Sequence, residues 1–471
     1  MKKFLKESFS IFIIWATSLV MFFPSLFVFF TNDDFFHLKI AQIHNFSDFL
    51  KFFYVSPEGW GLYRPIGTQV FYAIGTYIFK LQPYWMHIVL FALFFIIIYL
   101  VKRIMFELAE NKHVSFVAAF LYATSATHFG QLYFLATQEL WVGIFYLASI
   151  LWFLIYLKKP SIWLFMLSLI AFVFALMSKE TAVTLPLVLV LIYWFKKGAH
   201  ELKTIAKLSI PYWAILLVYA AFRIKFYGFT SGESYVWDFS VRLFNTLGWY
   251  GLWSLNIPEM LIDFVGPGLK LNPNLLLYWG SQFRAIFSLF GLSILAIMVA
   301  FVFKSKTFKK DLKIYTFGIL WFVVTLLPVL FLPLHKFSFY LTIPLSGIVL
   351  MLGQLFSKQK ILVLLFSVFW VFASVFTLRI TRETNWITQG ELVSQRVYEY
   401  FSKNRTNLIN KHIVFVDTPS DIGLPWSPTT VIRQALSDSN FFYVYFPELA
   451  KNISYSSGTG YTVESRQFLG Y

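Results

Sequence analysis

The stretch FSIFIIWATSLVMFFPSLFVFFTNDDFFH, residues 9–37, decides the fold, because an apolar run over residues 9–30 leads directly to the acids Asp33 and Asp34. About 20 apolar residues are enough for a helix to cross a bilayer. A charged side chain near the hydrocarbon costs on the order of 2.5–3.5 kcal/mol, so acids at the mouth of a span usually serve chemistry, ion binding or a lipid headgroup. The stretch therefore predicts a membrane helix with a functional site at its end. A solvated boundary cap is the alternative interpretation of the doublet.

The composition of the whole chain also indicates a membrane protein. Of the 471 residues, 58% are hydrophobic, 21% aromatic and only 13% charged, and the mean hydropathy is +0.67. An ordinary soluble domain has about 25% charged residues, so we expect a polytopic α-helical membrane protein. The net charge of +16 comes from basic clusters between apolar runs, which favours membrane orientation over nucleic-acid binding. The sequence has no cysteine, which excludes disulfides and thiolate metal sites.

Apolar windows recur along the chain, and we expect about eleven transmembrane helices. The windows lie near residues 9–30, 84–101, 114–133, 138–157, 161–178, 181–195, 206–222, 276–303, 314–333, 338–356 and 361–379. Basic residues fall in alternate loops, which the positive-inside rule assigns to the cytoplasm. This orientation places Asp33 and Asp34 outside. Counting the apolar stretch 241–257 as a further span would move the basic segment 304–313 to the outside.

The stretches 66–79 and 241–257 are therefore expected to be amphipathic interfacial or re-entrant helices, the first of them within an external loop over 31–83. We expect residues 1–379 to form a transmembrane catalytic domain. Residues 380–471 are expected to form a small α/β extracytoplasmic domain, with strands over 411–417 and 441–446. The protein is predicted to be a multi-pass protein of a prokaryotic plasma membrane, with its site and C-terminus outside.

Charged and polar residues gather on the predicted outer side. Arg64, within Tyr63-Arg64-Pro65, is a permanent cation that can grip a phosphate through two parallel hydrogen bonds, and an interfacial anchor is its plainer interpretation. Lys179-Glu180 can equally be a self-neutralising turn, and His335-Lys336 can be snorkelling residues. The candidate catalytic acids are Asp33, Asp34 and Glu139, and the candidate substrate-binding residues are His37, Tyr63, Arg64, Lys179, Glu180, His335, Lys336 and Tyr340.

Four motifs together resemble the GT-C superfamily of membrane glycosyltransferases, in particular its protein O-mannosyltransferase and aminoarabinose transferase branches. They are the acidic doublet after the first span, Tyr63-Arg64-Pro65 before an amphipathic helix, Ser178-Lys179-Glu180 followed by TAVTLP, and the late segment HKFSFY over 335–340. The resemblance covers residues 9–350. The chain departs from these relatives at the late segment, where they usually carry Arg-Tyr-x-Tyr, and in its tail, which shows no tetratricopeptide array.

The resemblance implies an inverting transfer of one sugar from a polyprenyl-phosphate donor to a protein, lipid or glycan acceptor at the outer face. Asp33 or Asp34 would take the proton of the acceptor hydroxyl. A divalent metal ion (Mg, Mn or Zn) held by Asp33 and Asp34 with Glu139 or His37 would offset part of the charge on the leaving lipid phosphate, and metal dependence stays open. The cations that would offset this charge are Arg64, Lys179, His335 and Lys336.

Two other functions stay open from the sequence, a transporter or flippase for lipid-linked saccharide and a non-catalytic membrane scaffold. A transporter should carry ionisable residues at mid-bilayer, and few charges occur inside the predicted spans. A scaffold should have lost one or more of the acids, which are all present. The sequence also has no Walker motif or nucleotide-binding glycine pattern, which argues against an ATP-driven pump and a nucleotide-sugar transferase.

Overall fold

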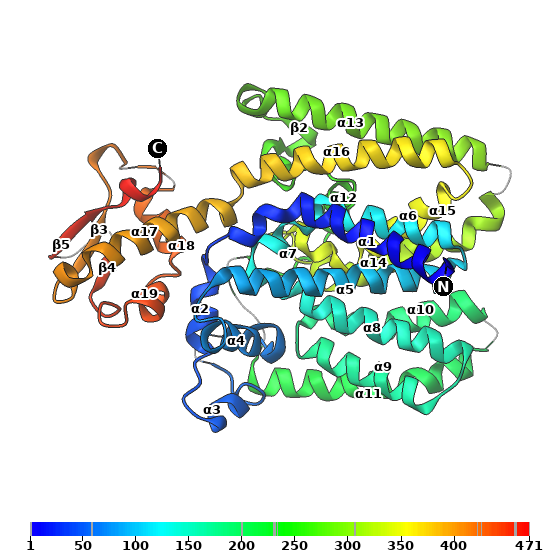
Figure 1. Cartoon of the computed structure of the whole chain (residues 1–471), viewed down its shortest axis with the longest axis horizontal. Helices are drawn as coiled ribbons and strands as arrows, with labels where there is room; N and C mark the ends of the chain where they lie inside the picture. The colour runs from blue at the N-terminus through cyan, green and yellow to red at the C-terminus, as the bar shows by residue number, and fades with distance from the viewer. Residues whose placement is uncertain are drawn as a thin grey trace.

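The computed structural model describes residues 2–57, 60–198, 201–228, 232, 234–305, 308–421, 423–424, 426–455 and 459–470. Most of these residues form a bundle of long helices, with a smaller unit at one end that holds the C-terminus (Figure 1). Parts of several expected segments lie outside the described residues: 58–59 of the external loop 31–83, 306–307 of the basic segment 304–313, and 422, 425, 456–458 and 471 of the C-terminal domain 380–471.

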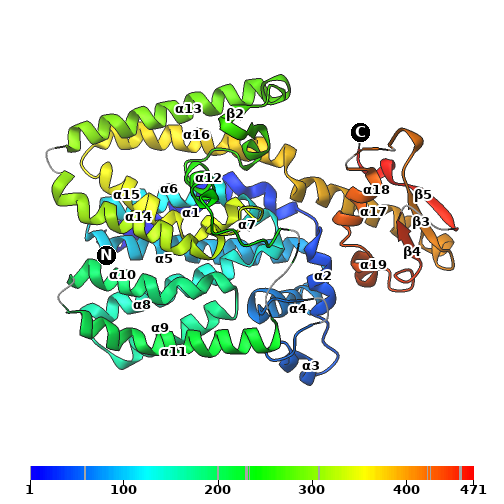
Figure 2. The ribbon, with the colours of Figure 1, turned by 180° about the vertical axis from the view of Figure 1, so that it is seen from behind.

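Seven of the described helices are long and apolar enough to cross a membrane, so the chain is a helical membrane protein. The first span is Phe9–Phe27, which covers most of α1 (Lys2–Phe22) and all of η1 (Phe23–Phe27). The second and third are α5 (Pro83–Ala109) and α8 (Glu139–Lys158). The other four are α11 (Leu202–Phe226), α13 (Asn274–Lys304), α14 (Phe308–Leu330) and α16 (Lys360–Thr384). The helices α13 and α16 run side by side along one edge of the bundle in both views (Figures 1 and 2).

The four remaining expected spans form shorter apolar helices. They are α6 (Lys112–Ala123), α9 (Ile162–Leu176), α10 (Leu185–Lys197) and α15 (Leu345–Leu355). Helices of 11–15 residues extend roughly 17–23 Å at 1.5 Å per residue, against a hydrocarbon core of about 30 Å. The number of eleven spans therefore stays a prediction.

The two stretches expected not to cross form short elements. Residues 66–79 fold as the π-helical turn η2 (Pro65–Val70) and α4 (Phe71–Tyr77), and the stretch 241–257 contains α12 (Arg242–Trp253). The helices α2 (Asp33–Ile40) and α3 (Phe46–Lys51) precede them in the first loop. Figure 1 shows α2, α3 and α4 at the end of the bundle that faces the C-terminal unit.

The C-terminal unit begins where α16 ends, five residues after the expected boundary at 379/380. The side chain of Asn385 caps the next helix, α17 (Trp386–Leu408), by accepting a hydrogen bond from the Ile387 N–H at 2.9 Å. Three parallel strands in the order β4-β3-β5 form its sheet. The elements after α17 are β3 (Ile413–Val416), α18 (Pro428–Ala435), α19 (Asn440–Tyr445), β4 (Ile453–Tyr455) and β5 (Tyr461–Glu464).

One strand was predicted correctly and one was wrong. The expected strand over 411–417 is β3, whereas the expected strand over 441–446 is helix α19. Helical spacing places Phe441 and Tyr445 on one face, where both rings pack against Phe35 of α2. A run of aromatic residues fits both the two-residue period of a strand and the 3.6-residue period of a helix. Packing against α2 favours the helix here.

Candidate functional site

The acidic doublet opens α2, and its two carboxylates lie in different environments. Asp34 is buried, and its Oδ2 accepts a hydrogen bond from the Thr31 N–H at 2.9 Å while its Oδ1 accepts one from the Tyr72 hydroxyl. Asp33 is exposed to solvent. The residue before it, Asn32, has φ 49° and ψ −123°, a conformation that a non-glycine residue rarely adopts and that often marks functional sites. Asp34 therefore fixes the turn, and Asp33 is the accessible carboxylate.

The protein around the doublet raises the proton affinity of both acids. Burial raises the pKa of Asp34 to about 7, against the lowering effect of the Tyr72 hydrogen bond. Desolvation by the surrounding protein also raises the pKa of Asp33, and the charge of Arg64 opposes this rise. An exposed carboxylate whose proton affinity is raised is suited to accepting a proton from a bound solute.

Arg64 is a buried cation with an ordered set of partners. Its Nε and Nη2 donate to the two carboxylate oxygens of Glu180 at 2.9 and 2.5 Å, and its Nη1 donates to the Gln138 side-chain oxygen at 2.8 Å. Burial raises the pKa of Glu180, and the ion pair with Arg64 lowers it. The effect of Arg64 is larger, so the pKa of Glu180 falls to about 2. A guanidinium carries five N–H donors. The two that remain have no hydrogen-bond partner within the described part of the chain.

The ammonium group of Lys179 is surrounded by protein partners. Its Nζ lies 2.7 Å from Glu139 Oε1, donates to the Thr137 carbonyl at 2.8 Å, and stands 4.8 Å from the ring centroid of Tyr340. Lys179 and Glu180 thus pair with residues of other segments, and the interpretation of a self-neutralising turn is wrong. Because Lys179 has no donor to spare, Arg64 is the better candidate to bind an anion.

Gly67 allows the Arg64 segment to approach its partners. A Cβ on Gly67 would stand 3.0 Å from both the Ser178 carbonyl oxygen and the Gln138 Cβ. The Ile66 N–H also donates to the Met177 carbonyl at 3.2 Å, which ties η2 to the turn before Lys179. The absence of a side chain at Gly67 therefore lets η2 lie against the two segments that hold Arg64.

His37 is buried between two aromatic rings, with centroid distances of 4.9 Å to Trp60 and 5.1 Å to Tyr72. Burial, helped by the charge of Arg64, lowers the pKa of His37 to about 3, so its ring is neutral at pH 7. Neither ring nitrogen has a hydrogen-bond partner among the described residues. A buried polar ring without partners is costly, which indicates that a ligand or water completes it.

The late segment contributes a neutral ring in place of the expected cation. His335 Nε2 lies 3.0 Å from the Tyr340 hydroxyl and its Nδ1 lies 3.1 Å from Ser234 Oγ. Burial lowers the pKa of His335 to about 4, so the expectation that it supplies positive charge at neutral pH is wrong. Lys336 points elsewhere, since it donates to the Asn245 side chain of α12 at 3.3 Å.

Tyr63 also lies outside the charged site. Its hydroxyl donates to the Phe53 carbonyl at 3.2 Å, and its ring packs against Phe222 and Tyr227. Apart from Asp34 and Lys336, the other predicted residues lie around Arg64, and the charge of Arg64 acts on each of their ionisable groups. We call this set the Arg64 cluster: Asp33, His37, Arg64, Glu139, Lys179, Glu180, His335 and Tyr340.

The described residues contain no group of three His, Asp or Glu side chains placed to hold a metal ion. Asp34 is bound to Thr31 and Tyr72, and Glu139 is paired with Lys179. The metal site on Asp33, Asp34 and Glu139 therefore stays a prediction.

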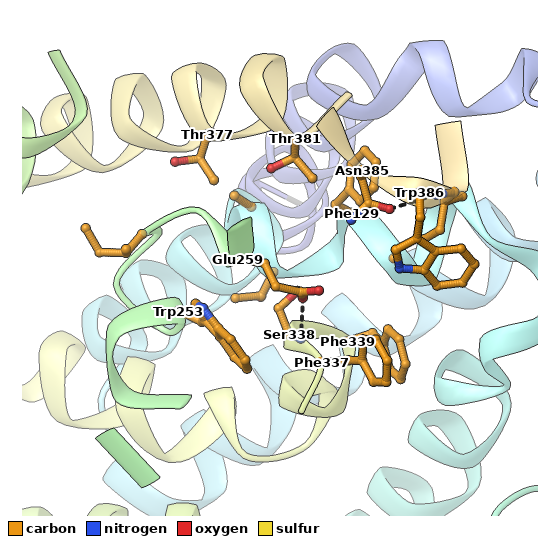
Figure 3. Close-up of a pocket in the computed structure, with 15 residues that line it drawn as sticks. Phe129, Trp253, Glu259, Phe337, Ser338, Phe339, Thr377, Thr381, Asn385 and Trp386 are labelled. Carbon is orange, nitrogen blue, oxygen red and sulfur yellow. Dashed lines mark hydrogen bonds between the residues drawn. The ribbon is translucent and has the colours of Figure 1, made fainter. Parts of the chain in front are cut away.

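An aromatic pocket adjoins the cluster, and sequence reasoning missed it (Figure 3). Phe339 lines the pocket and contacts the cluster, because Lys179 Nζ lies 5.4 Å from its ring centroid. Glu259 accepts a hydrogen bond from the Ser338 N–H at 2.6 Å, and burial raises the pKa of its carboxyl. The only sign in the sequence was an acid in an otherwise apolar stretch. The labelled lining residues are Phe129, Trp253, Glu259, Phe337, Ser338, Phe339, Thr377, Thr381, Asn385 and Trp386.

The C-terminal unit packs directly on the segment that carries the doublet. The Asn32 N–H donates to the Ala435 carbonyl of α18 at 2.7 Å, and Phe35 meets Phe441 edge to face at 5.1 Å. Gly390 of α17 lies against Thr31, where a Cβ would stand 2.5 Å from Thr31 Oγ1. The position of Asp33 therefore depends on the C-terminal unit as well as on the bundle.

Comparisons of the chain with protein-family models, with curated proteins and with solved structures find no match. The interpretation of the site therefore depends on its own geometry. It combines an accessible carboxylate, a buried guanidinium and a neutral histidine. Among the described residues, two N–H groups of the guanidinium and both ring nitrogens of the histidine have no hydrogen-bond partner. These groups can accept a proton, bind an anion and bind hydroxyl groups, respectively.

Proposed function

We propose that this chain is a membrane glycosyltransferase that moves a sugar from a polyprenyl-phosphate donor to an acceptor hydroxyl at the outer face of a prokaryotic plasma membrane. The observation that carries the proposal is the accessible carboxylate of Asp33 in the electrostatic field of the buried Arg64 guanidinium. A transfer of this kind needs a base for the acceptor proton and a cation for the leaving phosphate. The membrane helices that end beside the cluster suit a donor with a lipid tail.

In the proposed reaction, Asp33 takes the acceptor's hydroxyl proton as the hydroxyl oxygen attacks the anomeric carbon. The bond from that carbon to the phosphate oxygen breaks, and the lipid phosphate leaves with the bonding electrons. Arg64 binds this phosphate through its two remaining N–H groups, while Glu180 and Gln138 hold the guanidinium in place. Attack opposite the leaving group inverts the anomeric centre.

Asp34 is a positioning residue in this proposal, because both of its oxygens already accept hydrogen bonds from the protein. The neutral ring of His37 offers its nitrogens to sugar hydroxyl groups. The aromatic pocket of Figure 3 holds about 20 Å³, room for about one water molecule, and is too small for a saccharide. Protein, lipid and glycan acceptors all fit this chemistry, as does a role in cell-envelope or protein glycosylation.

The test is a cell-free assay of the purified full chain with a panel of radiolabelled polyprenyl-phosphate sugars and crude membrane acceptors. Release of lipid phosphate should be lowered by roughly 10²–10⁴-fold in Asp33→Asn, the typical contribution of a general base. Asp238→Asn is the matched control, because Asp238 is an acid outside the cluster that pairs with Arg242. Specific donor binding without turnover, unaffected by Asp33→Asn, would refute the proposal and favour a transporter or a scaffold.

A further inference from the structure

A groove lies between the outer ends of the first and last membrane helices, apart from the Arg64 cluster. It encloses about 620 Å³, within the range of pockets that bind organic ligands. The end of α1 and η1 forms one wall, and the end of α16 forms the other. Tyr133 of α7 (Phe129–Tyr133) and the first turns of α17 complete the lining.

The lipid-facing surface of α16 changes from apolar to basic as it enters this groove. A row of exposed apolar side chains runs along the helix at spacings of three or four residues, which places them on one face. Arg379 and Arg382 continue the same spacing beyond the last of them. The order of these side chains, apolar residues followed by cations, matches the order of groups in a phospholipid, acyl chains followed by a phosphate. The row is Ile361, Leu364, Val368, Phe372 and Val375.

The charges of the groove leave one cation available. Arg379 pairs with Glu383 at 3.4 Å, but the guanidinium of Arg382 has no ion pair or hydrogen bond to any residue that the structure describes. Glu391 faces the same groove and accepts a hydrogen bond from the Phe29 N–H at 3.2 Å. Burial raises the pKa of Glu391 to about 7, so this carboxyl neutralises Arg382 only in part at neutral pH.

We propose that this groove binds an anionic glycerophospholipid of the outer leaflet. Its phosphate would lie on Arg382 and Arg379, and its acyl chains would follow Met21, Phe27 and Val375. The proposal concerns a resident lipid and does not depend on the transferase activity.

The same groove touches the segment that leads to the acidic doublet. Val28 lines the groove. Phe29, four residues before Asp33, donates a backbone hydrogen bond to the Glu391 side chain in the groove. A lipid in the groove would therefore support the backbone on which the doublet stands.

The test measures lipid retention by the purified full chain with native mass spectrometry, after exchange into mixed micelles of phosphatidylglycerol or phosphatidylcholine. The wild type should retain phosphatidylglycerol at least tenfold more strongly, and Arg382→Gln should lose this preference. Arg242→Gln is the matched control, because Arg242 is an exposed external arginine of α12 away from the groove. Its lipid preference should equal that of the wild type.

Val375→Trp tests the apolar half of the site, since it fills the groove and leaves the charges unchanged. It should reduce retention of phosphatidylglycerol severalfold. Equal retention of both lipids by the wild type would overturn the proposal, because it would show only unspecific lipid around the helices. An unchanged preference in a double Arg379→Gln and Arg382→Gln variant would overturn it as well. Neither readout uses turnover, so these outcomes are distinct from a failure of the transferase proposal.

Discussion

Replacing Gly390 with alanine should test whether the C-terminal unit sets the position of the acidic doublet. A Cβ at this position would stand 2.5 Å from Thr31 Oγ1 and 3.0 Å from Asn32 Oδ1, where ordinary contact begins at 3.4 Å. The segment before Asp33 must therefore yield by about 0.9 Å, the difference between 3.4 and 2.5 Å. Thr31 is buried, and turning its hydroxyl away would break the hydrogen bond that it donates to Asn32 Oδ1 at 2.8 Å.

The expected change in stability is small, and the expected change in activity is large. Alanine in place of glycine inside a helix gains about 1 kcal/mol, whereas overpacking costs about 1–3 kcal/mol, so the free energy of unfolding should fall by at most about 2 kcal/mol. A displacement of about 1 Å at a reacting group can cost roughly 100-fold in rate. We therefore expect kcat to fall by about 10–100-fold in Gly390→Ala.

The assay pairs release of lipid phosphate with thermal unfolding of the same preparation. Gly291→Ala is the matched control, because Gly291 lies inside helix α13 and its added Cβ would meet nothing within 4 Å. The control should keep full activity. A Gly390→Ala protein that is folded and fully active would refute the reasoning that α17 positions the doublet. A loss of activity no greater than the loss of folded protein would refute it too.

Three further predictions follow from the site. Gly67→Ala places a Cβ 3.0 Å from the Ser178 carbonyl oxygen and should separate Arg64 from its partners. The KM for the donor should therefore rise, and an unchanged KM would contradict this. Tyr72→Phe leaves the buried Asp34 Oδ1 unpaired, and unfolding measurements should show a loss of about 1–3 kcal/mol. Because the pKa of Asp34 is raised from 3.8 to about 7, the folded state binds the extra proton, and stability should fall as pH rises from about 4 to 7. Asp34→Asn should flatten this slope in unfolding experiments.

The sequence predicts the full-length spans well because an apolar run of 20 residues has few other places to lie. It fails where a long-range polar contact interrupts such a run. The window 114–133 breaks after Ala123, where the Ser125 hydroxyl and the Ala126 N–H both donate to the side chain of Asn256. Satisfying these groups inside the protein allows a bend that hydropathy alone does not reveal.

For the site, the sequence identifies most of the residues that lie together around Arg64 but not how they pair. Lys179 and Glu180 are neighbours, so a local pair was a natural interpretation, yet each finds its partner in a segment that only the tertiary fold brings close. The charge state of His335 is also invisible in the sequence, because it depends on burial. Local sequence pattern identifies charged residues near the ends of apolar runs, whereas their pairing and protonation depend on packing.

The acidic doublet shows how two identical neighbours acquire different tasks. Successive side chains on a helix point about 100° apart, so α2 turns Asp34 toward the Thr31 N–H and Tyr72 while it leaves Asp33 open to water. Removing the charge of Asp33 should then lower turnover by roughly 10²–10⁴-fold with little effect on unfolding. The same change at Asp34 should alter the pH dependence of stability. Two isosteric substitutions at adjacent positions can therefore separate the proposed proton acceptor, Asp33, from the residue proposed to hold it in place, Asp34, which a boundary cap with no chemistry would not allow.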